Sequence, residues 1–229
     1  MEKIIFWDFD GTLAKPNDRF EAGVCLALRR YGYEVDYLEA SRFLKSIYPW
    51  EHPSESYPQE TASWWERFFA SLAPFYRQLG VSEGDHDKIN RAYQERIRTH
   101  NDYFLYDDTK AVLQKSVSLG YRNYILSNNY PELQGIVEAL GIAEYFCGMV
   151  VSGCVGYEKP RKELFAHAKA QAECGADCQI FMVGDNPTAD ILGAKAMGWT
   201  TVFVHKSCAN EADFACATLD EAIEKIASL

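Results

Sequence analysis

The sequence predicts an α/β fold: a Rossmann-like core of three layers, with a mostly parallel sheet between helices, and an inserted all-helical unit. Three observations predict this fold. An apolar, β-rich run opens the chain, residues 16–104 contain only helical patterns, and short apolar runs alternate with helical patterns after residue 106. Strands separated by helices of this length pair in parallel through right-handed crossovers, so the helices cover both faces of the sheet.

The first element is the apolar run from Ile4 to Trp7, which stops at Asp8. Such a run is typical of a buried parallel strand. Four helices are expected next, because apolar residues repeat every three or four positions and Gly32 and Gly80 stand where glycine often ends a helix. The repeats are Phe20, Val24, Leu28 and Tyr31; Tyr37, Ala40, Leu44 and Ile47; Trp64, Phe68, Leu72 and Tyr76; and Ile89, Tyr93 and Ile97.

Strands and helices alternate in the rest of the chain. Strands are expected over residues 123–126, 149–152, 179–183 and 201–204. Helices are expected over residues 111–119, 131–140, 161–172, 188–197 and 219–227. This order of elements is typical of one sheet with helices on both faces.

The charge of the chain excludes two classes of partner. The 229 residues include 33 acidic and 23 basic residues, a net charge of −10, and no basic run. A protein that binds duplex nucleic acid or an anionic membrane surface needs lysine and arginine to pair with phosphates. The apolar runs are also too short to span a bilayer, so we expect a cytoplasmic protein.

Polar residues follow the expected strands, at the edge where parallel sheets bind ligands. Asp8 and Asp10 follow the first strand, Ser127 ends another and Asp185 follows a third, while Lys159 precedes a helix. Carboxylates favour Mg²⁺, which bridges to substrate phosphate, and a lysine can neutralise phosphoryl oxygens. Each element alone is also typical of a turn, a helix cap or a solvated loop. Their joint occurrence in this order indicates a site for phosphoryl transfer.

Four segments resemble the motifs of the haloacid dehalogenase-like (HAD) hydrolase superfamily. They are Asp8-Phe9-Asp10-Gly11-Thr12, Leu126-Ser127-Asn128, Glu158-Lys159-Pro160 and Gly184-Asp185-Asn186-Pro187-Thr188-Ala189-Asp190-Ile191. The helical insertion is similar to the cap of the subgroup that contains phosphoglycolate phosphatases and β-phosphoglucomutases. The resemblance therefore implies a catalytic core over residues 1–14 and 105–229 and a helical cap over residues 15–104.

The resemblance also implies roles for the motif residues. Asp8 is the nucleophile that forms an aspartyl-phosphate, and Asp10 is the acid that protonates the leaving oxygen and then the base that activates water. Mg²⁺ is held by the carboxylates of Asp8 and Asp185 and by the backbone carbonyl of Asp10. Phosphoryl oxygens are bound by Ser127, Lys159 and the backbone N–H groups around Asn128, with Thr12 and Asp190 supporting these ligands from behind.

The presence of Asp10 decides which reaction the resemblance implies. The dehalogenases and the phosphonate-cleaving enzymes of the superfamily lack this second aspartate. The implied reaction is Mg²⁺-dependent hydrolysis of a phosphate monoester, with a small phosphorylated metabolite as substrate. Two alternatives stay open: a phosphomutase similar to β-phosphoglucomutase, and a non-catalytic module that binds a phosphorylated ligand.

The expected cap is rich in aromatic residues, because it holds 17 of the 32 in the chain. Their four-residue spacing predicts that most of them form the core of a small helix bundle. Trp50 and Tyr57 lie in a polar stretch with prolines and are the candidates for substrate contact. Closure of the cap would exclude water, with hinges near residues 14–16 and 102–106. The five histidines show no metal-ligand spacing, so none is assigned to the chemistry.

Overall fold

The computed structural model describes residues 2–48, 51–52, 64–175, 177–205 and 211–229. It consists of two compact units. We call Met1–Pro16 together with Tyr103–Leu229 the sheet unit, and Asn17–Asp102 the helical unit. These boundaries lie 2 residues from those expected for the core and the cap. That the helical unit acts as a cap stays a prediction.

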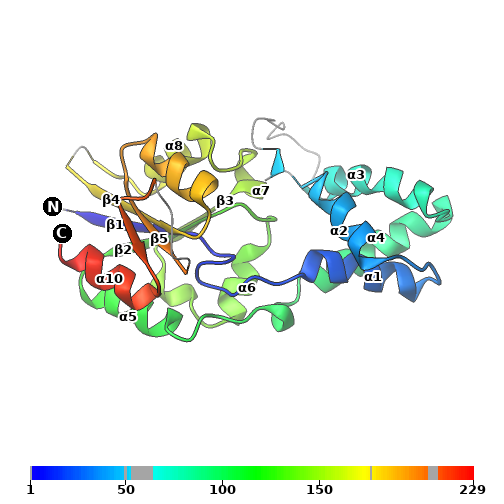
Figure 1. Cartoon of the computed structure of the whole chain (residues 1–229), viewed down its shortest axis with the longest axis horizontal. Coiled ribbons are helices and arrows are strands. Elements are labelled where there is room, and N and C mark those ends of the chain that lie inside the picture. Colours follow the sequence, from blue (N-terminus) through cyan, green and yellow to red (C-terminus); the bar gives the residue numbers. More distant parts are fainter. Residues whose placement is uncertain (1, 49–50, 53–63, 176, 206–210) are drawn as a thin grey trace. The chain divides into compact units, whose positions relative to one another are not determined.

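The sheet unit is built on six strands in the order β3-β2-β1-β4-β5-β6, and every neighbouring pair is parallel. The strands are β1 (Lys3–Trp7), β2 (Arg122–Ser127), β3 (Gly148–Val151), β4 (Gln179–Gly184), β5 (Thr200–Val204) and β6 (Phe214–Cys216). The helices are α5 (Thr109–Ser118), α6 (Leu133–Ala139), α7 (Ser152–Val155), α8 (Lys162–Gln171), α9 (Gly193–Lys195) and α10 (Leu219–Ala227). Figure 1 shows α5 and α10 on one face of the sheet and α8 on the other. The predicted α/β fold with a parallel sheet between helices is confirmed.

Strand β1 lies at the centre of the sheet and directs the chain toward one edge. Ile5 pairs with Asn123 on β2 and with Phe181 on β4. Residues 4–7 are fully buried, because helices cover both faces of the strand. Asp8 is the first residue beyond the strand, so the central strand delivers a carboxylate to the carboxyl edge of the sheet.

Two strands of the sheet unit differ from the prediction. Strand β6 was not expected; it has 3 residues and pairs in parallel with β5. The strand expected over residues 149–152 ends at Val151, because Ser152 begins the single-turn helix α7. Gly156 ends this turn with a φ of +87°, a left-handed conformation that favours glycine. A short 3₁₀ helix over Ala143–Tyr145 precedes β3.

The helical unit contains the four helices that the sequence predicted. They are α1 (Arg19–Arg30), α2 (Tyr37–Lys45), α3 (Trp64–Gln78) and α4 (Glu83–Ile97), followed by a 3₁₀ turn over His100–Asp102. Aromatic rings fill its interior: Phe68 stacks on Trp64 with ring centroids 5.0 Å apart and contacts Tyr93 at 5.9 Å. The predicted inward packing of these aromatic residues is confirmed. Trp50 and Tyr57, the candidates for substrate contact, lie outside the described residues.

The chain leaves and re-enters the sheet unit along two adjacent segments. The backbone N–H of Lys15 donates to the carbonyl of Phe104 at 2.7 Å, and the N–H of Tyr106 donates to the carbonyl of Leu13 at 3.1 Å. An antiparallel bridge between Ala14 and Leu105 lies between these bonds. The loop that follows Asp8 is therefore tied to the segment that returns to α5.

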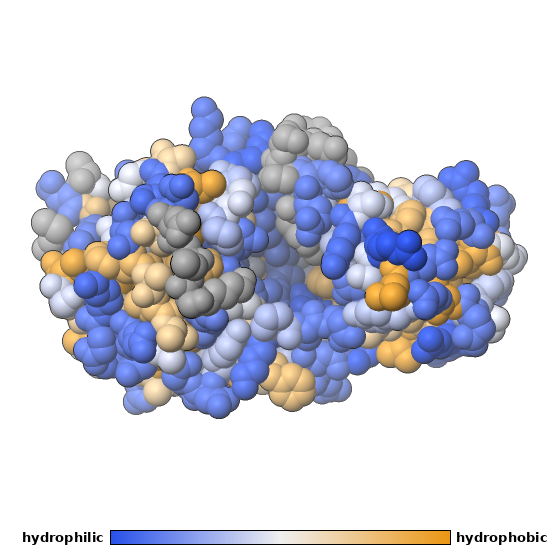
Figure 2. Space-filling view, in the orientation of Figure 1, coloured by the Kyte–Doolittle hydropathy of each residue, from blue (hydrophilic) through white to orange (hydrophobic). Residues whose placement is uncertain are grey.

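Figure 2 shows that hydrophilic residues cover most of the viewed face of each unit, with smaller apolar areas among them. Among the described residues, no helix combines the length and the apolar character that crossing a bilayer requires.

Candidate active site

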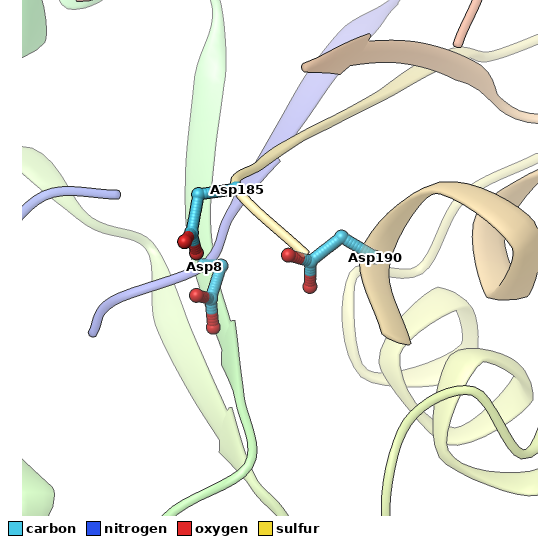
Figure 3. Close-up of side chains that lie close together, drawn as sticks. All are labelled: Asp8, Asp185 and Asp190. Atoms are coloured by element: carbon cyan, nitrogen blue, oxygen red, sulfur yellow. The ribbon is translucent and has the colours of Figure 1, made fainter. Parts of the chain in front are cut away.

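Three carboxylates converge at the carboxyl edge of the sheet. Asp8 directly follows β1 and Asp185 directly follows β4, and these strands are parallel neighbours. Asp190 comes from the helical turn after β4 and points its carboxylate toward the other two (Figure 3). Ligand atoms of the three residues lie within 4.8 Å of one another. This is an arrangement of hard oxygen donors, which suits a divalent cation such as Mg²⁺.

The helix expected over residues 188–197 is present, and its first part, which carries Asp190, has the π-helical form. This part spans Pro187–Leu192 and precedes the short helix α9. The Asn186 side chain accepts hydrogen bonds from the N–H groups of Thr188 and Ala189, and the Asn186 carbonyl accepts from Ile191 at 3.3 Å. This last bond spans five residues and widens the turn. The side chain and the carbonyl of Asn186 thus both accept hydrogen bonds from the first turn of the helix, and this favours the π-helical form.

Lys159 is the cation at the centre of the cluster, and its side chain is only 2% exposed. Its Nζ donates to Oδ1 of Asp8 at 2.7 Å, to Oδ1 of Asp190 at 2.6 Å and to the carbonyl of Leu126 at 2.8 Å. An ammonium group has three N–H donors, so these contacts use all of them. A phosphoryl oxygen can reach Lys159 only by taking the place of one of these partners.

Burial and charge act in opposite directions on this cluster. Burial lowers the pKa of Lys159, but the Asp190 and Asp8 carboxylates outweigh it and hold that pKa above its ordinary value. Burial raises the pKa of Asp8 and of Asp190, and Lys159 opposes the rise in both. One lysine therefore faces more carboxylate charge than it neutralises, and the donor set fits a bound divalent cation.

Ser127 ends the neighbouring strand β2 and Asn128 follows it, and their side chains have different surroundings. The Ser127 hydroxyl is buried and has no hydrogen-bond partner among the described residues. Buried polar groups are nearly always hydrogen-bonded, so this hydroxyl could bond a ligand. The Asn128 side chain is already engaged: Oδ1 accepts from the N–H of Lys159 at 2.7 Å, and Nδ2 donates to the carbonyl of Lys159 at 3.1 Å. Asn128 thus fixes the loop of Lys159 through its side chain.

The loop after Asp8 packs against Asp185. The Thr12 side chain is fully buried, and its hydroxyl donates to Oδ1 of Asp185 at 3.5 Å. Gly11 has a φ of +87°, and a Cβ atom there would lie 2.7 Å from the Asp185 carboxylate. Only glycine allows this approach. Asp10, the other carboxylate of the loop, accepts a hydrogen bond on Oδ2 from Asn129 at 2.7 Å.

Sequence reasoning missed two residues of this edge. Asn129 is not among the candidate residues that the sequence indicates, and its contact with Asp10 spans 119 positions of the chain. His205 follows β5, and its Nε2 lies 2.9 Å from the carbonyl of Thr12, whose role as an acceptor makes the histidine the donor. Its ring also stacks on Tyr106 with the centroids 3.7 Å apart. In both cases the available signal was a polar residue at the end of a strand.

Comparisons with known proteins agree with this geometry. A sequence model of haloacid dehalogenase-like hydrolases matches residues 2–198. The glyceraldehyde 3-phosphate phosphatase of Methanothermobacter thermautotrophicus is 31% identical over 214 residues, which cover 90% of this chain and 86% of that protein. The phosphoserine phosphatase of Thermus thermophilus is 31% identical over 134 residues, which are 58% of this chain and about half (53%) of that protein. The crystal structure of 2-haloacid dehalogenase from Pseudomonas syringae has the same fold, with a TM-score of 0.68, 21% identity, and coverage of 100% of this chain and 99% of that one.

Proposed function

Because the chain belongs to the haloacid dehalogenase-like hydrolase family, we propose that it hydrolyses a small phosphate monoester through an aspartyl-phosphate on Asp8. The observation that carries this proposal is the buried contact of Lys159 with Asp8 and Asp190 at the carboxyl edge of the sheet. It holds one carboxylate of the central strand in a fixed position beside a cation that can also bind phosphate. Two relatives named as phosphatases of phosphoserine and of glyceraldehyde 3-phosphate support the substrate class, a small phosphorylated metabolite.

The first step transfers the phosphoryl group to the protein. A carboxylate oxygen of Asp8 bonds to phosphorus while the bond between phosphorus and the alcohol oxygen breaks. Asp10 gives its proton to that departing oxygen, and the alcohol leaves. Lys159 and the Ser127 hydroxyl bind the phosphoryl oxygens as charge shifts onto them.

The second step hydrolyses the aspartyl-phosphate. Asp10, which is now ionised, takes a proton from water as the water oxygen bonds to phosphorus. The bond between Asp8 and phosphorus breaks, and inorganic phosphate leaves. Asp10 is then protonated again and ready for the next substrate, so one carboxyl group serves as acid and then as base.

A divalent cation fits the carboxylates at this edge. We propose Mg²⁺, held by the carboxylates of Asp8 and Asp185 and by the backbone carbonyl of Asp10, with Asp190 behind them. Asp190 is already engaged on both oxygens, by Lys159 on Oδ1 and by the N–H of Asn186 on Oδ2. When bound, the cation neutralises carboxylate charge that would otherwise repel the phosphate group.

The test is release of p-nitrophenol from p-nitrophenyl phosphate in the presence of Mg²⁺, with the Asp8→Asn variant beside the wild type. We expect the variant to lose on the order of 10⁴-fold in kcat, because the amide is no nucleophile. Asp213→Asn is the matched control: Asp213 is a hydrogen-bonded aspartate of the same unit that bonds Thr201 rather than the catalytic edge. Activity retained by Asp8→Asn, or unaffected by EDTA, would contradict the mechanism.

Two further measurements separate the alternatives. A phosphorylated peptide that contains Asp8, found by mass spectrometry after acid quenching, is expected for the proposed pathway. Isomerised sugar phosphate without net release of phosphate would instead identify a phosphomutase. A panel of phosphorylated metabolites then identifies the preferred ester. The proposed role of the helical unit as a cap is tested in the same panel, since substitutions there should change the preferred ester and leave the reaction type unchanged.

A further inference from the structure

Asn129 is the polar residue that contacts Asp10, and its surroundings leave it no freedom. It lies two residues beyond the end of β2 and is 1% exposed. Its Nδ2 donates to Oδ2 of Asp10 at 2.7 Å, and its Oδ1 accepts from the N–H of Tyr130 at 3.0 Å. Both ends of the amide are therefore engaged inside the protein.

The orientation of this amide follows from its partners. A backbone N–H can only donate, so the atom of Asn129 that faces Tyr130 must be the oxygen. The NH₂ group then faces Asp10. The contact therefore has one direction: Asn129 donates, and Oδ2 of Asp10 accepts.

The backbone of Asn129 is held as firmly as its side chain. Its N–H donates to the hydroxyl of Ser152 at 2.9 Å, and its carbonyl accepts from the N–H of Gly153 at 3.0 Å and from the same hydroxyl at 3.3 Å. A Cβ atom on Gly153 would lie 2.7 Å from the Asn129 carbonyl oxygen, so these two segments of the backbone approach to a distance that only glycine allows. Helix α7 thus anchors the residue that contacts Asp10.

We propose that Asn129 is a positioning residue that sets which oxygen of Asp10 exchanges the proton with the substrate. Because Oδ2 accepts from Asn129, Oδ1 is the oxygen of Asp10 that exchanges the proton. Asn129 also fixes the rotation of the carboxyl group, so that Oδ1 faces the departing oxygen in the first step and water in the second. This inference rests on the proposed function, since it acts through the acid and base role of Asp10.

A defect in a positioned acid has a kinetic signature that a folding defect lacks. The leaving group of p-nitrophenyl phosphate is a stable phenolate that departs without a proton. The leaving group of phenyl phosphate is more basic, so its departure depends on protonation by the acid. General acid catalysis contributes about 10²- to 10⁴-fold to a rate. Misplacing Asp10 should therefore slow phenyl phosphate far more than p-nitrophenyl phosphate.

The experiment measures kcat/KM for a series of substituted phenyl phosphates in Asn129→Asp and Asn129→Ala. The Asp substitution keeps the size of the side chain and an oxygen for the Tyr130 N–H, and it replaces the donor that faces Asp10. We expect kcat/KM for phenyl phosphate to fall about 10- to 100-fold and that for p-nitrophenyl phosphate to change less than about threefold. For p-nitrophenyl phosphate we expect kcat to fall and the phosphoenzyme to accumulate, because the second step needs Asp10 as a base.

Asn123→Ala is the matched structural control. Asn123 is a fully buried asparagine of β2, the strand that precedes Asn129, and it bonds Trp7, Ser116 and Tyr145 away from the carboxyl edge. We expect this variant to lose stability, measured as a lower thermal midpoint, and to slow all aryl phosphates by the same factor. Equal losses for good and poor leaving groups in the Asn129 variants, or no loss, would overturn the inference.

A double-mutant cycle with Asp10→Asn completes the test. If Asn129 acts through Asp10, then Asn129→Ala should cost less than about twofold in the Asp10→Asn background, because the acid is already absent. Independent, multiplying losses would overturn the positioning role. The Asp8→Asn variant keeps the two proposals apart: activity retained there contradicts the aspartyl-phosphate itself, whatever the Asn129 variants do.

Discussion

The two units bury different kinds of side chain. At the carboxyl edge of the sheet unit, charged and polar groups are enclosed: Asp8, Asn129, Lys159 and Asp190 are each 7% exposed or less. In the described part of the helical unit, the enclosed side chains are mainly aromatic and aliphatic, with Arg19 as the exception. Burial of charge costs free energy unless every group is paired, whereas burial of aromatic rings stabilises the fold. The sheet unit therefore encloses charged groups at a cost in stability, whereas the described interior of the helical unit consists mainly of side chains whose burial stabilises the fold.

The substitution Lys159→Met is expected to have the largest effect on the sheet unit. It leaves the carboxylates of Asp8 and Asp190 buried without their cation, so the free energy of unfolding should fall by about 3–5 kcal/mol. Activity should fall by at least about 10²-fold, because a ligand of the phosphoryl group is lost. Urea denaturation and hydrolysis of p-nitrophenyl phosphate measure the two effects. A variant as stable as the wild type would show that the lysine is not needed to offset the two carboxylates.

The substitution Phe68→Ala tests the other side of the comparison. Phe68 is 4% exposed and lies between Trp64 and Tyr93. Removing its ring should lower the free energy of unfolding of the helical unit by about 3–5 kcal/mol, measured by urea denaturation. The phosphoenzyme should still form on Asp8 at temperatures where the variant is folded. Tyr37→Ala, at a ring that is 39% exposed, is the control and should have little effect on stability.

Added Mg²⁺ should stabilise the sheet unit, because the carboxylate cluster lies in that unit. A cation that binds the folded carboxylate cluster should raise the free energy of unfolding by about 1–3 kcal/mol at saturation. Thermal unfolding with and without Mg²⁺ measures the rise. In Asp185→Asn the rise should disappear, and in Asp213→Asn it should remain. A rise that persists in Asp185→Asn would place the bound cation elsewhere.

The smallest effect is expected at Asp213, a polar group of the sheet unit with a structural role. Burial raises its pKa, but hydrogen bonds from Thr201 and the ammonium group of Lys195 outweigh burial and hold the pKa below its ordinary value of 3.8. A carboxyl group with a lowered pKa stabilises the fold above 3.8, and this contribution is lost as pH falls through the lower value. Asp213→Asn should therefore lower the free energy of unfolding by less than about 1 kcal/mol at neutral pH, because the ion pair is partly exposed.

The measurement compares urea midpoints of the wild type and Asp213→Asn across pH. The difference should be constant from about pH 7 down to about pH 5, and it should narrow only below the ordinary pKa. A difference that narrows already between those two pH values would mean that another group stabilises this turn.

The sequence predicted elements whose signal is local. Apolar runs predicted five of the six strands, because both faces of those strands are buried. Strand β6 was not predicted, since a run of 3 residues, Phe214, Ala215 and Cys216, is too short to give a local signal and forms a strand by pairing with β5. The sequence predicted a helix over residues 188–197 but not the π-helical form of its first part, for a related reason. Its width depends on the bonds of Asn186 and on the packing of Asp190 against Gly184, where a Cβ atom would lie 2.2 Å from the carboxylate.

The candidate site divides in the same way. Asp8, Ser127, Lys159 and Asp185 stand in motifs, so the sequence could name them, and their catalytic roles stay predictions. What the sequence could not indicate is which polar groups meet. Asn129 reaches Asp10 because β1 and β2 are neighbours in the sheet, which no spacing along the chain reveals.

The paired linkers have a consequence for how this chain can change. The bridge between Ala14 and Leu105 holds the two ends of the intervening segment side by side. The entropic cost of closing a loop grows only slowly with its length, so a longer or shorter segment between these positions changes the stability of the sheet little. Segments of other lengths and folds could therefore replace residues between these two positions, while the strands of the sheet keep the same pairing register.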